Sequence, residues 1–236
     1  MKPYYESGGI TIYHGDCREI LPAGLEYDTV ISDPPYGIHY NEEDEPQAKH
    51  VASHRCQVAS VFGDDKPFDP RPWIDRPAIL WGANCYSDKL PALPTWLVWD
   101  KVTRNGLKLR IAECEFAWTN CVARSQVFRY LWSGAYRQEE RGEYWHPTQK
   151  PVDLMRWCIS LARPVPTIIL DPFMGSGTTL RAAKDLGRKA IGIEIEEKYC
   201  EIAALRLQQQ VIEFPRNEKQ RAGIQGSLLE TLGDNP

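Results

Sequence analysis

The 236-residue sequence lacks any long apolar run, and no stretch approaches the roughly 20 apolar residues that cross a bilayer. Its first residues, MKPYYESGG, also lack the apolar segment of a secretion signal. Apolar residues make up 42% and charged residues 25%, which are ordinary values for a folded globular chain and argue against disorder or a fibrous architecture. We therefore expect one folded domain over residues 1–236, in the cytoplasm and without a membrane partner.

Paired cysteines are missing as well. The seven cysteines are scattered and never show the close CxxC spacing of zinc or redox sites. They are Cys17, Cys56, Cys85, Cys114, Cys121, Cys158 and Cys200. This pattern predicts buried free thiols and no metal site.

An overall surplus of positive charge is absent, because the formal net charge is −4. Affinity for nucleic acid comes mainly from neutralised phosphates, so any such surface on this chain must be local. Arginine and lysine concentrate between residues 104 and 137. That stretch is the candidate, although an ordinary solvated charged face explains the same residues.

Short apolar runs that end on an acidic residue recur along the chain. They span 27–32, 167–170 and 190–193, and the acids that follow them are Asp33, Asp171 and Glu194. Amphipathic helical patterns cover 152–163, 178–186 and 196–210, with Gly187 as a C-cap. Strands alternating with helices predict βαβ units and a parallel sheet. Further strands are expected at 78–82 and 96–99, with less regular β-rich sequence over 111–132.

The tetrapeptide Asp33-Pro34-Pro35-Tyr36 follows the first of these runs. Ligands bind at the carboxyl ends of parallel strands, and two prolines stiffen a turn while removing N–H donors. Such a turn presents a carboxylate and carbonyl acceptors beside an aromatic ring, which suits an amino group on a flat ring. An ordinary Asp-Pro turn is the alternative explanation.

The segment 171–179, DPFMGSGTT, has the form of a glycine-rich turn between a strand and a helix. It is neither a GxGxxG fingerprint nor a phosphate loop, because the lysine of the latter is absent. Glu194 ends the next strand, where a carboxylate accepts hydrogen bonds from ribose hydroxyls. These features predict a nucleoside-containing cofactor.

Taken in order, DPPY, HPTQKP at 146–151 and DPFMGSGTT resemble the beta group of DNA amino-methyltransferases over residues 15–207. The resemblance implies a Rossmann-like, S-adenosylmethionine-dependent methyltransferase fold of class α/β. It also implies a mostly parallel sheet with helices on both faces and a circularly permuted order, in which the catalytic half precedes the cofactor half.

By position, the resemblance implies a catalytic set and a cofactor-binding set. The catalytic set is Asp33, Pro34, Pro35 and Tyr36. The cofactor-binding set is Asp16, His146, Thr148, Lys150, Asp171, Phe173, Gly175, Ser176, Gly177, Thr178 and Glu194. Lys150 is expected to pair with the methionine carboxylate of the cofactor. Helix capping by the HPT segment and a plain turn acid at Asp16 are the alternatives.

Three segments remain for other roles. Residues 41–70 are a candidate lid loop, 102–145 correspond to a short target-recognition segment, and 215–236 form a polar C-terminal tail. Trp96 and Trp99 are expected in the core. Side chains suited to base edges or phosphates are Arg104, Asn105, Lys108, Arg110, Arg124, Gln126 and Arg129.

Asp33, where N4-cytosine enzymes typically have serine, resembles the N6-adenine enzymes. The predicted reaction is direct methyl transfer to a flipped adenine in DNA, without a covalent cysteine intermediate. N4-cytosine methylation, a catalytically silent DNA-binding module and an enzyme acting on glutamine or RNA are the alternatives. In enzymes of the last kind the cofactor motif normally comes first. The resemblance is also compatible with a homodimer and with a cognate restriction endonuclease acting on the same site.

Overall fold

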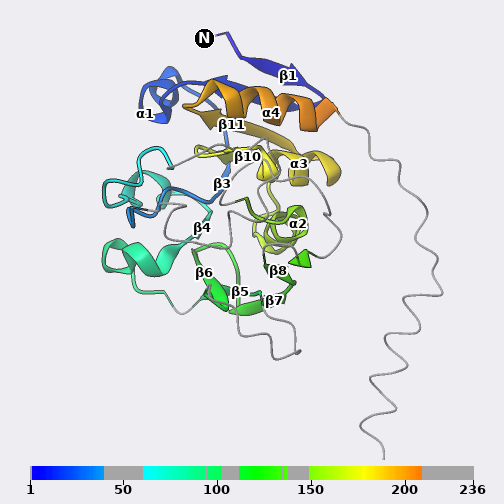
Figure 1. Ribbon diagram of the computed structural model, residues 1–236. Coiled ribbons are helices and arrows are strands. Elements are labelled where there is room, and N and C mark those ends of the chain that lie inside the picture. Colours follow the sequence, from blue (N-terminus) through cyan, green and yellow to red (C-terminus); the bar gives the residue numbers. More distant parts are fainter. Residues whose placement is uncertain are drawn as a thin grey trace, which may run out of the picture.

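The computed structural model describes residues 2–39, 61–93, 95–101, 112–133, 136–137 and 149–208. Within these ranges the chain folds around a nine-stranded mixed sheet in the order β1-β2-β11-β10-β3-β4-β6-β5-β7 (Figure 1). Its strands are β1 (Tyr5–Ser7), β2 (Ile10–His14), β3 (Thr29–Ser32), β4 (Ala78–Trp81), β5 (Trp96–Asp100), β6 (Cys114–Thr119), β7 (Gln126–Arg129), β10 (Ile168–Asp171) and β11 (Lys189–Glu194). A separate hairpin pairs β8 (Trp132–Ser133) with β9 (Tyr136–Arg137).

Most of the strands run in one direction. Parallel pairing joins β2, β11, β10, β3 and β4 in sequence. Strand β6 pairs antiparallel with both β4 and β5, so β5 runs in the same direction as β4, and β7 is parallel to β5. The carboxyl ends of these strands and the amino end of β6 therefore lie at one edge, called here the carboxyl edge of the sheet.

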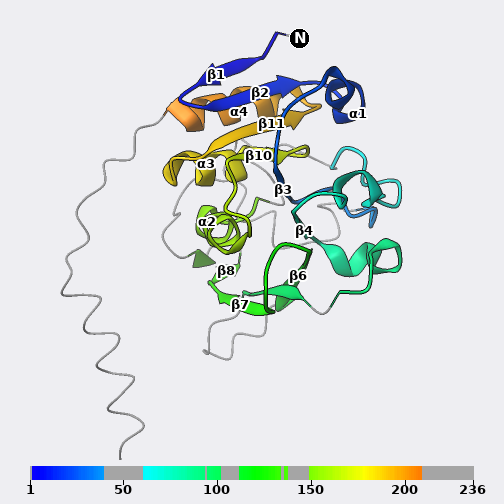
Figure 2. The same cartoon turned by 180° about the vertical axis from the view of Figure 1, so that it is seen from behind.

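Helices cover both faces of the sheet (Figures 1 and 2). Helices α2 (Val152–Leu161), α3 (Thr178–Asp185) and α4 (Glu197–Gln208) pack with one set of strand residues, among them Ile31, Ile79 and Ile169. Helix α1 (Cys17–Ile20) and the 3-10 segments η4 (Arg71–Trp73) and η5 (Ala83–Lys89) pack with the alternate set, which includes Val30, Leu80 and Leu170. Segment η1 (Leu21–Ala23) continues α1. Alternate strand residues thus supply two cores, one on each face.

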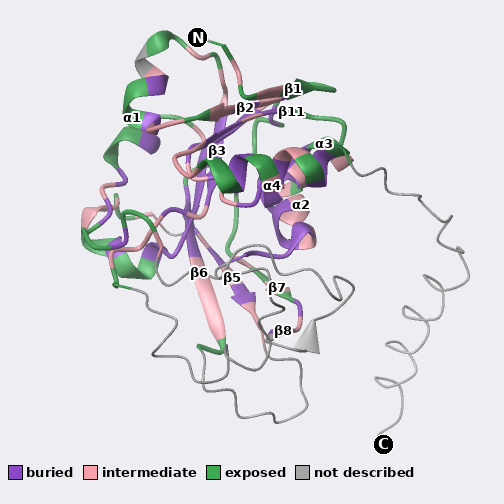
Figure 3. Cartoon of the chain, turned by 45° about the horizontal axis from the view of Figure 1, so that its top comes forward, coloured by how far each residue is buried: buried purple, intermediate pink, exposed green. Residues whose placement is uncertain are grey.

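The central strands are buried on both faces, as their continuous apolar sequences require. Every residue of β3 and of β4 is buried, and Figure 3 shows the buried colour along β3. Trp99 is fully buried and Trp96 is half-buried, so both pack in the core as expected. None of the helices within the described residues is long and apolar enough to cross a bilayer.

The expected fold class, α/β with a mostly parallel sheet and helices on both faces, is confirmed. The expected helices and strands are found within a few residues of their predicted bounds, and Gly187 follows α3 with φ of 63°. The turn 33–36 precedes the loop 171–179 along the chain, but circular permutation itself stays a prediction. Among the described cysteines, Cys85 is exposed and Cys114 half-buried, contrary to the expectation that all are buried.

Part of the expected lid loop 41–70 is packed into the fold. Residues 40–60 lie outside the described residues, whereas 61–70 include the buried Asp64 and Phe68. The Asp64 carboxylate accepts hydrogen bonds from the amides of Gly37, at 2.7 Å, and Ile38, at 3.3 Å. This end of the candidate lid is thereby fixed to the chain that follows Tyr36. The polar tail 215–236 also lies outside the described residues. Within the segment 102–145, residues 102–111, 134–135 and 138–145 lie outside them as well.

Candidate active site

The turn 33–36 and the loop 171–179 lie side by side at the carboxyl edge, because β3 and β10 are neighbouring parallel strands. Ser32, the last residue of β3, is fully buried and donates from Oγ to Asp171 Oδ1 at 2.6 Å. The charge of Asp33 is close enough to Asp171 to contribute to raising its pKa. The candidate catalytic turn and the expected cofactor loop therefore form one site.

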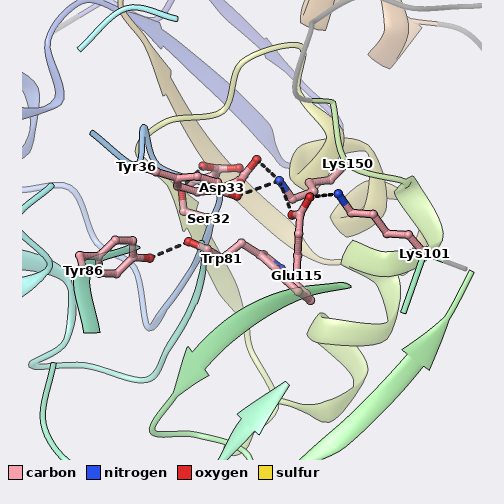
Figure 4. Close-up of polar contacts among 9 residues, drawn as sticks. Ser32, Asp33, Tyr36, Trp81, Tyr86, Lys101, Glu115 and Lys150 are labelled. Carbon is pink, nitrogen blue, oxygen red and sulfur yellow. Dashed lines mark hydrogen bonds and ion pairs between the residues drawn. The ribbon is translucent and has the colours of Figure 1, made fainter. Parts of the chain in front are cut away.

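Asp33 uses both carboxylate oxygens in this structure. The hydroxyl of Tyr36 donates to Oδ1 at 2.5 Å, and Nζ of Lys150 donates to Oδ2 at 2.6 Å (Figure 4). Burial raises the pKa of Asp33, and the ammonium of Lys150 opposes that rise without cancelling it. The result is a carboxylate held firmly in a poorly solvated place, next to an aromatic ring.

The position of the Tyr36 ring depends on Gly82, the residue that follows β4. A Cβ atom at position 82 would lie 1.9 Å from Cε1 of Tyr36, so the ring rests directly on the glycine backbone. Gly82 also has φ of 69°, a left-handed conformation that L side chains adopt with strain. The neighbouring Tyr86 hydroxyl donates to the carbonyl of Trp81 at 2.6 Å, which ties η5 to the end of β4. Gly82, which has no side chain, thus leaves the space that the Tyr36 ring occupies.

The side chain of Lys150 packs against the candidate catalytic turn 33–36. Its side chain is 5% exposed, and Nζ contacts Asp33 and the Tyr36 hydroxyl, the latter at 3.0 Å. Nζ is also 3.1 Å from Oε2 of Glu115, whose Oε1 forms an ion pair with Lys101. Burial lowers the pKa of Lys150, but the two carboxylates outweigh burial and raise it, so the side chain is an ammonium. The expected pairing of Lys150 with the cofactor stays a prediction, and its observed partners are protein carboxylates.

Glu115 and Lys101 are site residues that sequence reasoning missed. They lie at the amino end of β6 and directly after β5, where the antiparallel pairing of these strands brings them together. No motif assigned either residue to the catalytic or the cofactor-binding set. The available signal was an acidic residue inside the apolar run CEFAWT, where a charge requires a partner.

The loop 171–179 is tied to Glu194. The Gly175 amide donates to Glu194 Oε2 and the Glu196 amide to Oε1, both at 2.9 Å. Burial raises the pKa of Glu194 to about 7, since these two amide donors offset burial only in part. Burial likewise raises the pKa of Asp171 to about 6, against hydrogen bonds from Ser32, Thr179 and the Phe173 amide. Neither carboxyl has a lysine or arginine in ion-pair distance among the described residues.

The remaining part of the loop is held by packing. The Arg206 guanidinium donates from α4 to the Ser176 carbonyl at 2.6 Å and to its Oγ at 2.9 Å. Gly177 has φ of 79°, and a Cβ there would lie 2.8 Å from Cβ of Ala203. Thr178, the first residue of α3, is buried, and the Phe173 ring packs edge-on against Trp73 and Phe68. The loop is therefore preformed.

The other expected cofactor residues have different placements. Asp16 caps the amino end of α1 and pairs with Arg18, and the Gly15 amide donates to the Glu194 carbonyl at 2.8 Å. Asp16 is thus near the end of β11 and is also the turn acid of the alternative explanation, while its place in a cofactor site stays a prediction. His146 and Thr148 lie outside the described residues.

The candidate DNA-contacting residues are divided between two edges. Arg124 and Gln126 lie before and at the start of β7, and so at the edge opposite to Asp33. Arg129 ends β7 at the carboxyl edge, where it is 3.5 Å from Asp100. The structure thus brings Arg129, but neither Arg124 nor Gln126, to the edge that carries the candidate active site. Residues Arg104, Asn105, Lys108 and Arg110 lie outside the described residues.

Comparison with known proteins identifies the family. Residues 97–205 match the N6/N4 methyltransferase family model, described as DNA methylase. Type II methyltransferase M.HinfI of Haemophilus influenzae is 44% identical over 251 residues, with 84% of this chain and 68% of that protein covered. Type II methyltransferase M.ScaI of Streptomyces caespitosus is 29% identical over 258 residues, with 88% and 84% covered. The chain therefore belongs to the N6/N4 family of DNA methylases, as its motifs predicted.

Solved structures share the fold. The M1.HpyAVI complex with S-adenosylmethionine is 26% identical, with a TM-score of 0.50 over 85% of this chain and 100% of that chain. The PvuII cytosine-N4-specific DNA methyltransferase is 17% identical, with a TM-score of 0.56 over 90% and 91%. Family membership identifies S-adenosylmethionine as the methyl donor, in agreement with the cofactor expected from the sequence.

The residues of the loop fit that cofactor. Half-buried Glu194 would offer carboxylate oxygens to the ribose hydroxyls, and Asp171 would supply negative charge for the sulfonium cation. Among the described residues, neither Glu194 nor Asp171 pairs with a lysine or arginine. This agrees with a ligand that brings hydroxyl donors and a positive charge.

Proposed function

We propose that this DNA methylase transfers a methyl group from S-adenosylmethionine to the N6 amino group of adenine in DNA. The observation that carries the proposal is the aspartate of the turn. Asp33 directly follows Ser32, which is hydrogen-bonded to Asp171 of the loop 171–179, and its charge acts on Asp171. A serine at position 33, typical of N4-cytosine enzymes, would offer one hydroxyl in place of two acceptor oxygens.

In the proposed mechanism the target adenine leaves the base stack, because N6 within a duplex is out of reach of the donor. Asp33 and the Pro34 carbonyl accept hydrogen bonds from the two amino hydrogens. Loss of conjugation with the ring then makes the nitrogen lone pair available, and Tyr36 stacks on the base. The cofactor supplies an electrophilic methyl group, and the residues of the chain supply positioning. The proton displaced from nitrogen passes to the Asp33 carboxylate.

The direct test is the identity of the product. DNA is incubated with the protein and labelled S-adenosylmethionine, digested to nucleosides and separated by chromatography with mass detection. We expect the label in N6-methyl-2′-deoxyadenosine. Label in N4-methyl-2′-deoxycytidine would replace the proposal by the cytosine alternative, and no label on DNA would favour the silent binding module.

Asp33→Ala tests the proposed role of the turn. We expect loss of methyl transfer by at least about a hundredfold, since acid-base groups of this kind contribute about that much or more. Binding of S-adenosylmethionine, measured by calorimetry, should persist because Asp33 does not belong to the loop 171–179. Full activity of this variant would remove Asp33 from the mechanism.

DNA is the proposed partner of the carboxyl edge, with Arg129 as a contact among the described residues. A homodimer and a cognate restriction endonuclease stay predictions. Modification-sensitive sequencing of DNA from cells that express the protein would identify the base and the recognition site together.

A further inference from the structure

Glu115 lies between two ammonium groups at the carboxyl edge of the sheet (Figure 4). Lys101 contacts its Oε1, and Lys150 lies 3.1 Å from its Oε2 and 2.6 Å from Asp33. The exposed fractions of the side chains of Lys101, Glu115, Lys150 and Asp33 are 12, 20, 5 and 16%. Four mostly buried charges of alternating sign thus form a row that is neutral as a whole.

Such a row is costly to interrupt. A buried charge that loses its partner is destabilised far more than a surface charge, because water cannot replace the partner. Burial raises the pKa of Glu115, but Lys150 and Lys101 together outweigh burial and hold it below its usual value. Glu115 is therefore an anion that fixes two cations, although it contacts neither the turn 33–36 nor the loop 171–179 in the contacts described.

The row has a consequence for Asp33. Its two carboxylate oxygens already accept from Tyr36 and Lys150, so an incoming amino group must share or displace one of these donors. Lys150 can weaken its contact with Asp33 without becoming an unpaired buried cation, because its second carboxylate, Glu115, remains 3.1 Å away. Without Glu115, the ammonium would depend on Asp33 alone.

We propose that Glu115 is a positioning residue for methyl transfer, which holds Lys150 so that a carboxylate oxygen of Asp33 is available to the target amino group. This inference rests on the role of Asp33 in the proposed function. Glu115 acts through Lys150 and touches neither the base nor the cofactor.

Glu115→Gln is the first test. We expect kcat to fall about ten- to a hundredfold, as for a misplaced catalytic group, while KM for S-adenosylmethionine stays within about twofold. The charge of Glu115 contributes to the raised pKa of Asp33, so the acid limb of the pH profile should move to lower pH in this variant. Glu115→Asp keeps the charge and should keep the limb, with intermediate kcat. Glu113→Gln, the same change on an exposed neighbour, is the matched control and should leave both unchanged.

A double variant separates positioning from charge balance. Glu115→Gln combined with Lys101→Met removes one charge of each sign, so the row stays neutral and folding is protected. The proposal predicts that kcat remains low, because Lys150 still has Asp33 as its remaining carboxylate. Recovery of the wild-type kcat, or an unchanged kcat in Glu115→Gln itself, would overturn the inference. An active Asp33→Ala variant would instead refute the proposed function.

Discussion

Ser32 and Asp171 are 139 residues apart in the chain and share a 2.6 Å hydrogen bond beneath the candidate active site. Ser32 immediately precedes the turn 33–36, and Asp171 opens the loop 171–179. The bond therefore fixes the distance between the part of the chain proposed to hold the base and the part proposed to hold the methyl donor. Displacement reactions depend steeply on such a distance.

Ser32→Ala should weaken this connection. The buried Asp171 carboxylate loses a donor, which destabilises the fold by about 1 to 3 kcal/mol and lowers the thermal midpoint. Affinity for S-adenosylmethionine should fall as well, because Asp171 positions the Phe173 amide. Calorimetry measures both effects. The control is Ser160→Ala, an exposed serine whose hydroxyl donates to the carbonyl of its own helix; equal losses in the two variants would contradict the argument.

Gly82→Ala should displace the Tyr36 ring. The added Cβ falls inside the ring, so Tyr36 must leave its hydrogen bond with Asp33. Methyl transfer should fall at least about tenfold beyond any effect of backbone strain, which by itself costs about 1 to 2 kcal/mol. Gly24→Ala is the matched control, because Gly24 has φ of 84° and open space around the added atom. If both variants keep wild-type kcat, Tyr36 has no positional role.

Glu194 should make cofactor binding depend on pH. Burial raises its pKa to about 7, and the proposed hydrogen bonds from ribose hydroxyls require its ionised form, so binding below that pH must expel a proton. Affinity therefore reaches its full value well above pH 7 and is lost as the pH falls through 7, by up to about tenfold per unit. Titration calorimetry at several pH values measures the slope, and Glu194→Gln should remove this contribution. A slope that the glutamine variant retains would exclude Glu194 as its source.

Arg206→Met should weaken the attachment of the loop 171–179 to α4. The guanidinium is buried, and its hydrogen bonds to the Ser176 carbonyl and hydroxyl are charge-assisted, so their loss costs about 1.5 to 3 kcal/mol of stability. We expect a lower melting temperature and a higher dissociation constant for S-adenosylmethionine. Arg188→Met, at an exposed position, serves as the control, and a matching loss there would show that the effect is not specific to the loop.

Strand ends and helices could be predicted from the sequence. Apolar runs followed by Asp33, Asp171 and Glu194 predicted strand ends, because β-branched residues favour strands and proline or glycine stops them. Their placement at one edge followed from the rule that parallel strands share the direction of their carboxyl ends. The helices were predicted from periodicity, since an apolar stripe must be buried.

Interactions between distant segments were not readable in the same way. Lys150 was assigned to the cofactor because of its motif, yet its ammonium contacts Asp33, 117 residues away. Arg124 and Gln126 have suitable side chains for DNA, but the direction of β7 carries them to the edge opposite to Asp33. Strand order and direction in the sheet decide such placements, and neither is encoded in the local pattern.

The sequence by itself determined the family, the order of the motifs, the methyl donor and the class of fold, because each depends on residue types at short spacing. The tertiary structure alone decided that Glu115 and Lys101 belong to the site and that Gly82 seats the ring of Tyr36. The physical reason is that a buried charge or a missing side chain acquires meaning only from the atoms packed against it. Those atoms come from strands that the fold, and not the chain order, makes neighbours.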